Sequence, residues 1–254
     1  IINKGVHASG LFLSYAPLDE TLPTEIITDK EGEQHVSASY DMEGVAEIGV
    51  KLDLLSLKTL DVIGEACKLS KVAEEDIDIE DPSIYDFLAR TRLYYGLFQI
   101  ETGLAGDATF KAKPRGIRQL SACISIARPG AMAEIPTLVD YYATGNLKRI
   151  HPQFDEILKD TANVIIYQES INDICQQVYA MNAIDAEEVA RAIRKKKRAD
   201  IVKWEAVIFA AGEKLGIPQA VTNQFWATCN KSADYLFSVN HGLPYSELAA
   251  AHTS

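Results

Sequence analysis

The sequence has little of what several classes of protein require. Its 4 cysteines include no Cys-x-x-Cys pair and its 5 histidines no His-x-x-x-His pair, which argues against a zinc site. No apolar run approaches the roughly 18 residues of a membrane-spanning helix, and the first residues lack the order of a signal peptide. Because the cysteines lie far apart, we expect four reduced thiols in a cytoplasmic protein without a membrane segment. Since the first residue is Ile1 and not Met, we expect a processed chain or a piece of a longer one.

Positive charge is also scarce, and it is unevenly placed. The chain carries 25 Lys and Arg against 36 Asp and Glu, a net charge of −11. Six of the basic residues fall within eight positions: Arg191, Arg194, Lys195, Lys196, Lys197 and Arg198. In nucleic-acid binding the placement of Lys and Arg matters more than the overall balance. The sequence therefore predicts one anion-binding segment in an acidic chain.

The first 60 residues have the pattern of strands. Residues 10–14 form a short β candidate, and 26–27 and 36–40 flank a predicted hairpin turn at 29–32. Residues 48–54 alternate strictly between apolar and other side chains. This alternation predicts a strand that buries Ile48, Val50, Leu52 and Leu54 and presents Lys51 and Asp53 on its other face.

From about residue 56 the apolar period becomes that of helices. After a stripe that begins at Leu57 and an acidic connector at 74–82, we expect helices at 83–92, 117–127, 133–144, 153–160, 164–181, 186–214 and from 217 onward, and a long loop at 96–115. The fold class is therefore α+β, with a small β-containing part followed by a large helical one.

The basic segment has the pattern of an amphipathic helix. Arg191, Arg194, Lys195 and Arg198 fall within an arc of about 100°, opposite the apolar Val189 and Ile193. A dense cationic stripe is unfavourable unless an anion neutralises it, so a phosphate is one explanation and a solvated face balanced by nearby carboxylates is the other. Asp185 and Glu188 are predicted to form a capping box at the start of this helix.

Six motifs resemble, in order, those of one family. They are His7-Ala-Ser-Gly10, residues 50–60, residues 96–101, residues 127–130 with Ile135-Pro136, residues 151–169 and residues 186–197. Val50-Lys-Leu-Asp-Leu54, for example, resembles the Val-Lys-Phe-Asp-Phe of the family C replicative DNA polymerases, the DNA polymerase III alpha subunits of bacteria and phages. Six such motifs at about the family spacing are a specific signal.

The chain also departs from the family pattern. Ala190 stands where the family often has the first of two arginines, and Arg194 replaces a usual glycine. The family's Gly-Tyr-Gly-Phe-Asn-Lys-Ser-His is matched weakly, either by Asn230-Lys-Ser232 or by Val239-Asn240-His241. Such divergence suits a phage-encoded or otherwise distant member.

The resemblance implies a domain organisation and an activity. Residues 1–60 would be the C-terminal part of a palm of the polymerase-beta nucleotidyltransferase type, and residues 61–254 the helical fingers. The implied reaction is DNA-directed DNA synthesis, with two Mg²⁺ ions about 3.5–4 Å apart. The family's first two catalytic aspartates have no counterpart here, so the palm is incomplete and the isolated chain is expected to be inactive. The expected partners are dNTP, primer–template DNA, a region or subunit with the missing palm and thumb, and other replisome proteins.

The resemblance also assigns residues to roles. Asp53 matches the third catalytic aspartate and would be a Mg²⁺ ligand, because Mg²⁺ prefers carboxylate oxygens. Lys51 would neutralise phosphate charge or keep Asp53 ionised, although alternation alone indicates a surface Lys–Asp pair. The residues expected to contact nucleotide or DNA phosphate are Arg128, Arg191, Arg194, Lys195 and Arg198. Tyr167 is expected to be a packing residue.

Two other functions stay open at the level of sequence. One is a non-catalytic interaction module derived from the polymerase, which would have no need of Asp53. The other is an unrelated Mg²⁺-dependent hydrolase that uses Asp76 and Asp78, which imitate a catalytic Asp-x-Asp pair. Their acidic connector ends in a proline, which favours a solvated loop instead.

Overall fold

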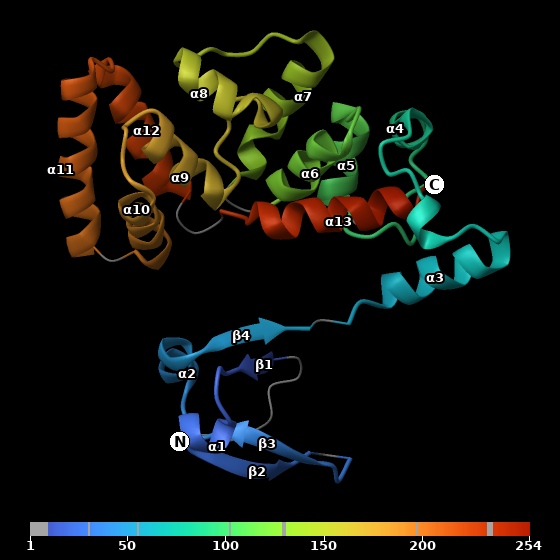
Figure 1. The fold of residues 1–254 in the computed structure, drawn as a ribbon. Helices are drawn as coiled ribbons and strands as arrows, with labels where there is room; N and C mark the ends of the chain where they lie inside the picture. The colour runs from blue at the N-terminus through green and yellow to red at the C-terminus, as the bar shows by residue number, and fades with distance from the viewer. Residues whose placement is uncertain are drawn as a thin grey trace. The chain divides into compact units, whose positions relative to one another are not determined.

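The computed structural model describes residues 10–29, 31–54, 56–101, 103–128, 131–196, 198–232 and 236–254. The chain divides into two compact units, Ile1–Lys58 and Thr59–Ser254 (Figure 1). The first contains two small sheets, and the regular elements described in the second are helices, as the predicted α+β class requires. His7, Pro129, Gly130 and Lys197, which belong to the predicted motifs, lie outside the described residues.

The first unit holds two separate two-stranded antiparallel sheets. β2 (Thr24–Thr28) and β3 (Gln34–Ala38) form the predicted hairpin. β1 (Gly10–Leu13) pairs with β4 (Val50–Asp53), so that Leu11 lies opposite Leu52. The connecting segments contain two short helices, α1 (Leu18–Thr21) and α2 (Met42–Ile48).

The prediction for residues 48–54 is wrong in two respects. The strand begins at Val50 because the preceding residues form α2, whose N-cap Asp41 accepts a hydrogen bond from the N–H of Gly44. The apolar face is not buried either, since Val50 is 51% exposed and Leu52 44%. Lys51, predicted to lie on the exposed face of the strand, is half-buried and lies opposite Phe12 on the same face of the sheet. Among the described residues of this unit, no second layer covers the apolar face of the pair β1–β4.

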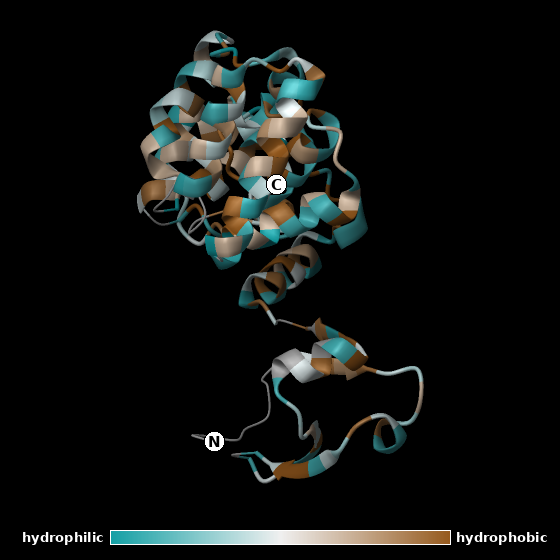
Figure 2. Cartoon of the chain, turned by 90° about the vertical axis from the view of Figure 1, so that its left-hand side faces the viewer, coloured by the Kyte–Doolittle hydropathy of each residue, from teal (hydrophilic) through white to brown (hydrophobic). Residues whose placement is uncertain are grey.

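The second unit is a bundle of irregularly crossing helices. These are α3 (Lys58–Ser70), α4 (Pro82–Arg90), α5 (Gly103–Ala112), α6 (Ile117–Ile126), α7 (Ile135–Thr144), α8 (Pro152–Ile157), α9 (Gln168–Gln177), α10 (Ala183–Lys195), α11 (Arg198–Leu215), α12 (Gln219–Ser232) and α13 (Val239–Ala251), with 3₁₀ turns at Glu74–Asp76, Met132–Glu134 and Lys159–Thr161. Apolar and polar residues alternate along the same helices, as expected of amphipathic elements around a core (Figure 2).

The core of this unit consists of three clusters of buried residues. One gathers Phe154, Tyr179, Ile193 and Phe225 from α8 to α12. The other two are centred on α6, which packs against α5 and α13. The four cysteines are free, as predicted, and burial raises the pKa of the Cys175 thiol to about 12. Among the described residues, no helix is both long and apolar enough to cross a membrane.

Two predictions for this unit are corrected. The expected loop at 96–115 contains α5, whose Ala105, Ala108 and Ala112 are buried. Glycines such as Gly106 favoured a loop in the sequence-based prediction. In the structure Gly106 lies within α5, where a Cβ would lie only 2.5 Å from the carbonyl oxygen of Ile100, so this position requires glycine. The expected helix at 186–214 is two helices, α10 and α11, because Lys196 has a left-handed conformation with φ 50°.

Candidate phosphate-binding site

Two segments far apart in the sequence meet at the start of α9 and α13. Phe237 donates its backbone N–H to the carbonyl of Ile166 at 3.0 Å, and Gln168 donates its own to the carbonyl of Phe237 at 2.9 Å. These bonds form a short parallel bridge between Tyr167 and Phe237. They place the N-terminal ends of α9 and α13 side by side, and we call this meeting point the α9–α13 junction, residues 166–169 and 237–239.

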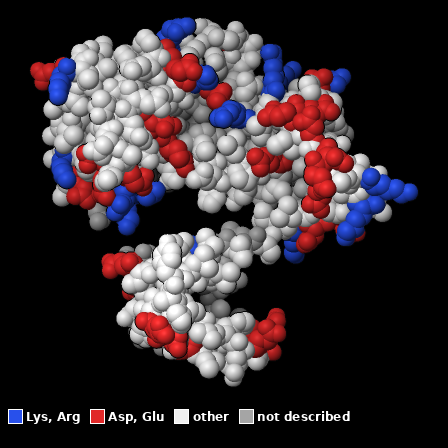
Figure 3. All heavy atoms as spheres, viewed as in Figure 1, with Lys and Arg blue, Asp and Glu red and all other residues white. Residues whose placement is uncertain are grey.

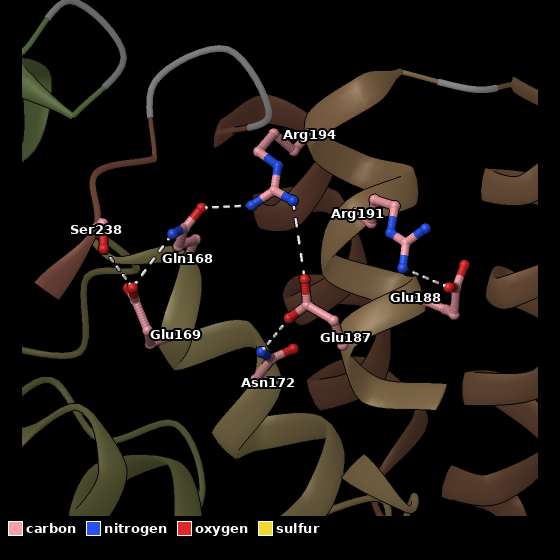
Figure 4. Close-up of polar contacts among 8 residues, drawn as sticks. All are labelled: Gln168, Glu169, Asn172, Glu187, Glu188, Arg191, Arg194 and Ser238. Carbon is pink, nitrogen blue, oxygen red and sulfur yellow. Dashed lines mark hydrogen bonds and ion pairs between the residues drawn. The ribbon is translucent and has the colours of Figure 1, made fainter. Parts of the chain in front are cut away.

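Glu169 fastens the junction by adding a second acceptor to the N-terminal cap of α13, whose N-cap residue is Ser238. Its carboxylate accepts a hydrogen bond from the hydroxyl of Ser238 at 2.6 Å (Figure 4). It also accepts one from the N–H of Val239 at 3.0 Å. Burial tends to raise the pKa of this carboxyl group, but the hydrogen bonds from Ser238 and Val239 outweigh burial and lower the pKa below its ordinary value. A negative charge is favourable at this position because the first turn of a helix presents free N–H groups.

Tyr167 serves packing, as predicted. Its side chain is 7% exposed and its hydroxyl lies 2.8 Å from the hydroxyl of Ser121 on α6. Burial raises the pKa of this phenol, which stays neutral. Tyr167 therefore connects the junction to the core and does not face a ligand.

Of the two arginines near the end of α10, Arg194 contacts the junction and Arg191 pairs within its own helix. Arg194 donates from one terminal nitrogen to the side-chain oxygen of Gln168 at 2.8 Å, and its other terminal nitrogen lies 3.8 Å from Glu187 (Figure 4). Asn172 donates to the second oxygen of Glu187 at 2.8 Å. Arg191 forms an ion pair of 2.8 Å with Glu188 on its own helix.

The single cationic stripe expected from the sequence is divided. Arg191, Arg194 and Lys195 belong to the last turns of α10, whereas Arg198 begins α11 beyond the left-handed Lys196. The predicted capping residue is also wrong, because Asn182, three residues before Asp185, is the N-cap of α10 and accepts from the N–H of Asp185 at 2.9 Å. Cations in the last turn of a helix are stabilised by its dipole, so the end of α10 holds them at little cost.

Arg128 contacts the junction from the segment just after α6. Its guanidinium carbon lies 3.8 Å from the centre of the Phe237 ring, a cation–π contact, and its buried Nε has no hydrogen-bond partner among the described residues. Phe237 in turn begins a row of rings along α13, with His241 at 6.1 Å and Tyr245 at 6.2 Å from His241. Sequence reasoning assigned no role to these rings, although the spacing of four residues between 237, 241 and 245 predicts one helix face.

The other candidate residues lie away from this junction in the sequence. The register places Asp53 opposite Gly10 at the end of β4, and Lys51 opposite Phe12. Asp76 ends a 3₁₀ turn, and the carboxylate of Asp78 accepts from the N–H of Glu80 at 3.0 Å. Asp76 and Asp78 are exposed in a connector, as predicted, and this geometry does not provide the strand that a catalytic pair would need.

One potential metal-binding group was missed by the sequence analysis. Asp29, Glu33 and His35 place ligand atoms within 4.8 Å of one another in the β2–β3 hairpin. The carboxylate of Asp29 is already used by the turn, since it accepts from the N–H groups of Glu31 and Glu33 and lies 2.8 Å from the His35 ring. These hydrogen bonds stabilise the hairpin turn and explain why the three side chains lie together without a metal ion.

The α9–α13 junction thus has two arginine contacts, Arg194 on Gln168 and Arg128 on Phe237, while the carboxylate of Glu169 occupies the start of α13. On the face drawn in Figure 3, acidic side chains form broad patches and basic ones smaller groups. Residues 59–219 match the family described as the bacterial DNA polymerase III alpha subunit finger domain, and the chain belongs to this family.

Curated relatives extend this match over nearly the whole chain. The chain is 32% identical over 265 residues to the DNA polymerase III subunit alpha of Saccharopolyspora erythraea, 31% over 255 residues to that of Campylobacter jejuni and 29% over 260 residues to that of Thermus aquaticus. These matches cover 98%, 96% and 97% of this chain but only 22%, 21% and 21% of the relatives. The chain thus spans about a fifth of the length of the curated relatives it matches.

Proposed function

We propose that this chain is part of a DNA-directed DNA polymerase. In this proposal residues 61–254 are fingers that bind the triphosphate of an incoming dNTP, and residues 1–60 are the last part of a palm. The observation that carries the proposal is the approach of Arg194 to Gln168 at 2.8 Å, beside a junction that Arg128 reaches through Phe237. The family match and the alpha-subunit relatives support the reaction class.

The charge distribution around the junction explains what the fingers would do. A dNTP carries several negative charges, and the leaving pyrophosphate gains charge as the primer 3′-hydroxyl attacks. Arg194 and Arg191 would hold the triphosphate with planar guanidinium groups that match phosphate oxygens. Lys195 and Arg198, on either side of the left-handed Lys196, would contact the DNA backbone, and Arg128 is proposed as a third phosphate contact near the row of rings.

The proposed palm residues, Asp53 and Lys51, would help to bind the catalytic metal ions. Two Mg²⁺ ions, when bound, activate the primer hydroxyl and stabilise the charge of the triphosphate. Asp53 would supply one carboxylate for them, and Lys51 would stabilise its ionised form. One carboxylate supplies too few ligands to fix two ions, so upstream palm sequence or a separate subunit would provide the others.

Primer extension tests the proposal directly. We expect Mg²⁺-dependent extension of a primed template only when the upstream region is restored to the chain. In that protein, Asp53→Asn should abolish extension, because it removes a metal ligand, and Arg191→Ala should weaken it by about tenfold or more. The matched control is Asp76→Asn, which removes the same charge from the exposed connector and should change little.

Two outcomes would contradict the proposal. Extension by the 254-residue chain alone would mean that it contains a complete carboxylate set. Absence of extension in both forms, with binding to primer–template intact, would favour the non-catalytic interaction module.

A further inference from the structure

The two arginines of α10 differ in how their charge is balanced. Arg191 has a carboxylate partner at 2.8 Å, Glu188, one turn earlier on the same helix. Arg194 has its short contact, also 2.8 Å, with the neutral amide of Gln168, while its carboxylate neighbour Glu187 stays at 3.8 Å. Arg194 is therefore held in place by a neutral group and is only weakly balanced by the longer ion pair with Glu187.

The orientation of Gln168 is itself fixed. Its amide nitrogen donates to Glu169 at 3.2 Å, which leaves the amide oxygen to face Arg194. Glu169 is anchored by Ser238 and by the backbone of Val239. An unbroken series of hydrogen bonds thus runs from the start of α13 through Gln168 to the guanidinium of Arg194 (Figure 4). Five N–H donors are available on an arginine, and Gln168 occupies only one nitrogen, so most donors remain for a ligand.

Glu187 is a competitor for the same guanidinium. Asn172 holds its carboxylate by a hydrogen bond of 2.8 Å, so the charge stays close to Arg194. Arg194 and Glu187 have side chains 45% and 47% exposed, and ion pairs of this kind contribute little stability. A phosphate can replace Glu187 at the outer nitrogen while Gln168 keeps its contact.

We propose that Gln168 is a positioning residue that orients Arg194 toward a polyphosphate, and that Glu187 is a built-in counter-ion that lowers the affinity of this site. The inference rests on the proposed phosphate-binding role of Arg194 and adds to it the residues that tune the site.

Binding of inorganic triphosphate to the 254-residue chain, measured by calorimetry at about 0.15 M salt, where charges are screened beyond about 8 Å, tests the inference. Gln168→Ala should weaken binding about fivefold, because Arg194 loses the contact that orients it. Glu187→Gln should strengthen binding about threefold, because the amide removes the competing charge but still accepts from Asn172. Effects of opposite sign are not expected if these side chains only support the fold.

Matched variants separate local from general effects. Gln176→Ala removes an exposed glutamine from the same helix, and Glu213→Gln removes one negative charge at the exposed end of α11. Both should leave the affinity within about twofold of the unsubstituted chain, since charges beyond a Debye length are screened. Gln168→Glu keeps the contact but neutralises Arg194, and should weaken binding as Gln168→Ala does.

The outcomes distinguish this inference from the proposed function. If Arg194→Gln leaves triphosphate binding unchanged, the phosphate-binding role of Arg194 is wrong. If Arg194→Gln weakens binding about tenfold but Gln168→Ala and Glu187→Gln have no effect, the role stands and the positioning inference is wrong. An increase for Glu213→Gln equal to that for Glu187→Gln would mean that only net charge matters.

Discussion

At the α9–α13 junction the carboxylate of Glu169 has two groups of hydrogen-bond partners, the start of α13 and the side chain of Gln168. Glu169 caps α13 and also holds Gln168, so the same carboxylate supports a helix and a binding residue. Because hydrogen bonds to the charged form lower its pKa below 4.5, the folded state favours the ionised group. Glu169 therefore contributes stability above its unfolded pKa, and this contribution is lost as the pH falls through the lower, folded pKa.

Substitution of Glu169 by Gln tests this linkage. Near neutral pH we expect a loss of about 1–2 kcal/mol in the free energy of unfolding, since the cap keeps its shape but loses its charge. The difference between the two proteins should shrink at acid pH, as the carboxylate of Glu169 becomes protonated. Urea unfolding followed by circular dichroism at both pH values measures it.

Asp173 supplies a control with a pKa shift of opposite sign. Partial burial of its carboxyl group, with a smaller effect of Glu169, raises the pKa of Asp173, although the residue remains largely exposed. Asp173→Asn should therefore cost no stability at neutral pH, in contrast to Glu169→Gln. Equal losses at both pH values for Glu169→Gln would contradict the linkage.

At the scale of helices and strands, sequence patterns located most elements and failed at their ends. Apolar periodicity predicted α4, α6 and α7 to within a few residues, and turn composition predicted the β2–β3 hairpin. The break at Lys196 was not predictable, because nothing in a run of lysines marks one of them as left-handed. The α5 helix was not predicted because glycine usually indicates a loop. At position 106 glycine is required by close packing against the carbonyl oxygen of Ile100, which the sequence does not reveal.

For the candidate site, the sequence indicated the basic residues but not their interaction partners. The arginine cluster is visible as residue types, so the sequence identified Arg191 and Arg194. Their partners were not identified, because the contact between Arg194 and Gln168 bridges two helices and the cap of α13 by Glu169 depends on tertiary structure. Periodicity reports which face a residue occupies and carries no information about what lies opposite.

The start of α10 gives a prediction at this scale. Asn182→Ala should destabilise the helical unit by about 1 kcal/mol, because the N–H of Asp185 loses its acceptor. Asn182→Ser, which can still cap, is the matched control and should cost only a few tenths of that. Thermal unfolding measures both, and equal losses for the two variants would mean that capping is not the cause.

Across the whole molecule, the two units differ in how well they bury apolar side chains. Phe225 is 2% exposed and stacks on Tyr179 with ring centres 5.5 Å apart, whereas Leu52 on β4 is 44% exposed. Phe225→Ala should therefore lower the free energy of unfolding by about 3–5 kcal/mol, and Leu52→Ala by less than about 1 kcal/mol.

Tryptophan fluorescence is a suitable readout for this comparison. Trp204 and Trp226 are buried in the cluster that contains Phe225, so their emission reports the helical unit. In urea, Phe225→Ala should shift the midpoint of this signal and Leu52→Ala should leave it unchanged. A large shift for Leu52→Ala would mean that stability of the helical unit depends on the strands of the first.

The packing of α13 on α6 also has a consequence for how the protein is made. Leu120 and Ile124 of α6 share a core cluster with Ala249 and Ala250 of α13, although all of α7 to α12 lies between them in the chain. A ribosome releases α6 long before α13, and contacts between distant segments form late. During synthesis the side of α6 that packs on α13 therefore stays uncovered until α13 has been made, after α7 to α12, and α13 then completes both this cluster and the α9–α13 junction.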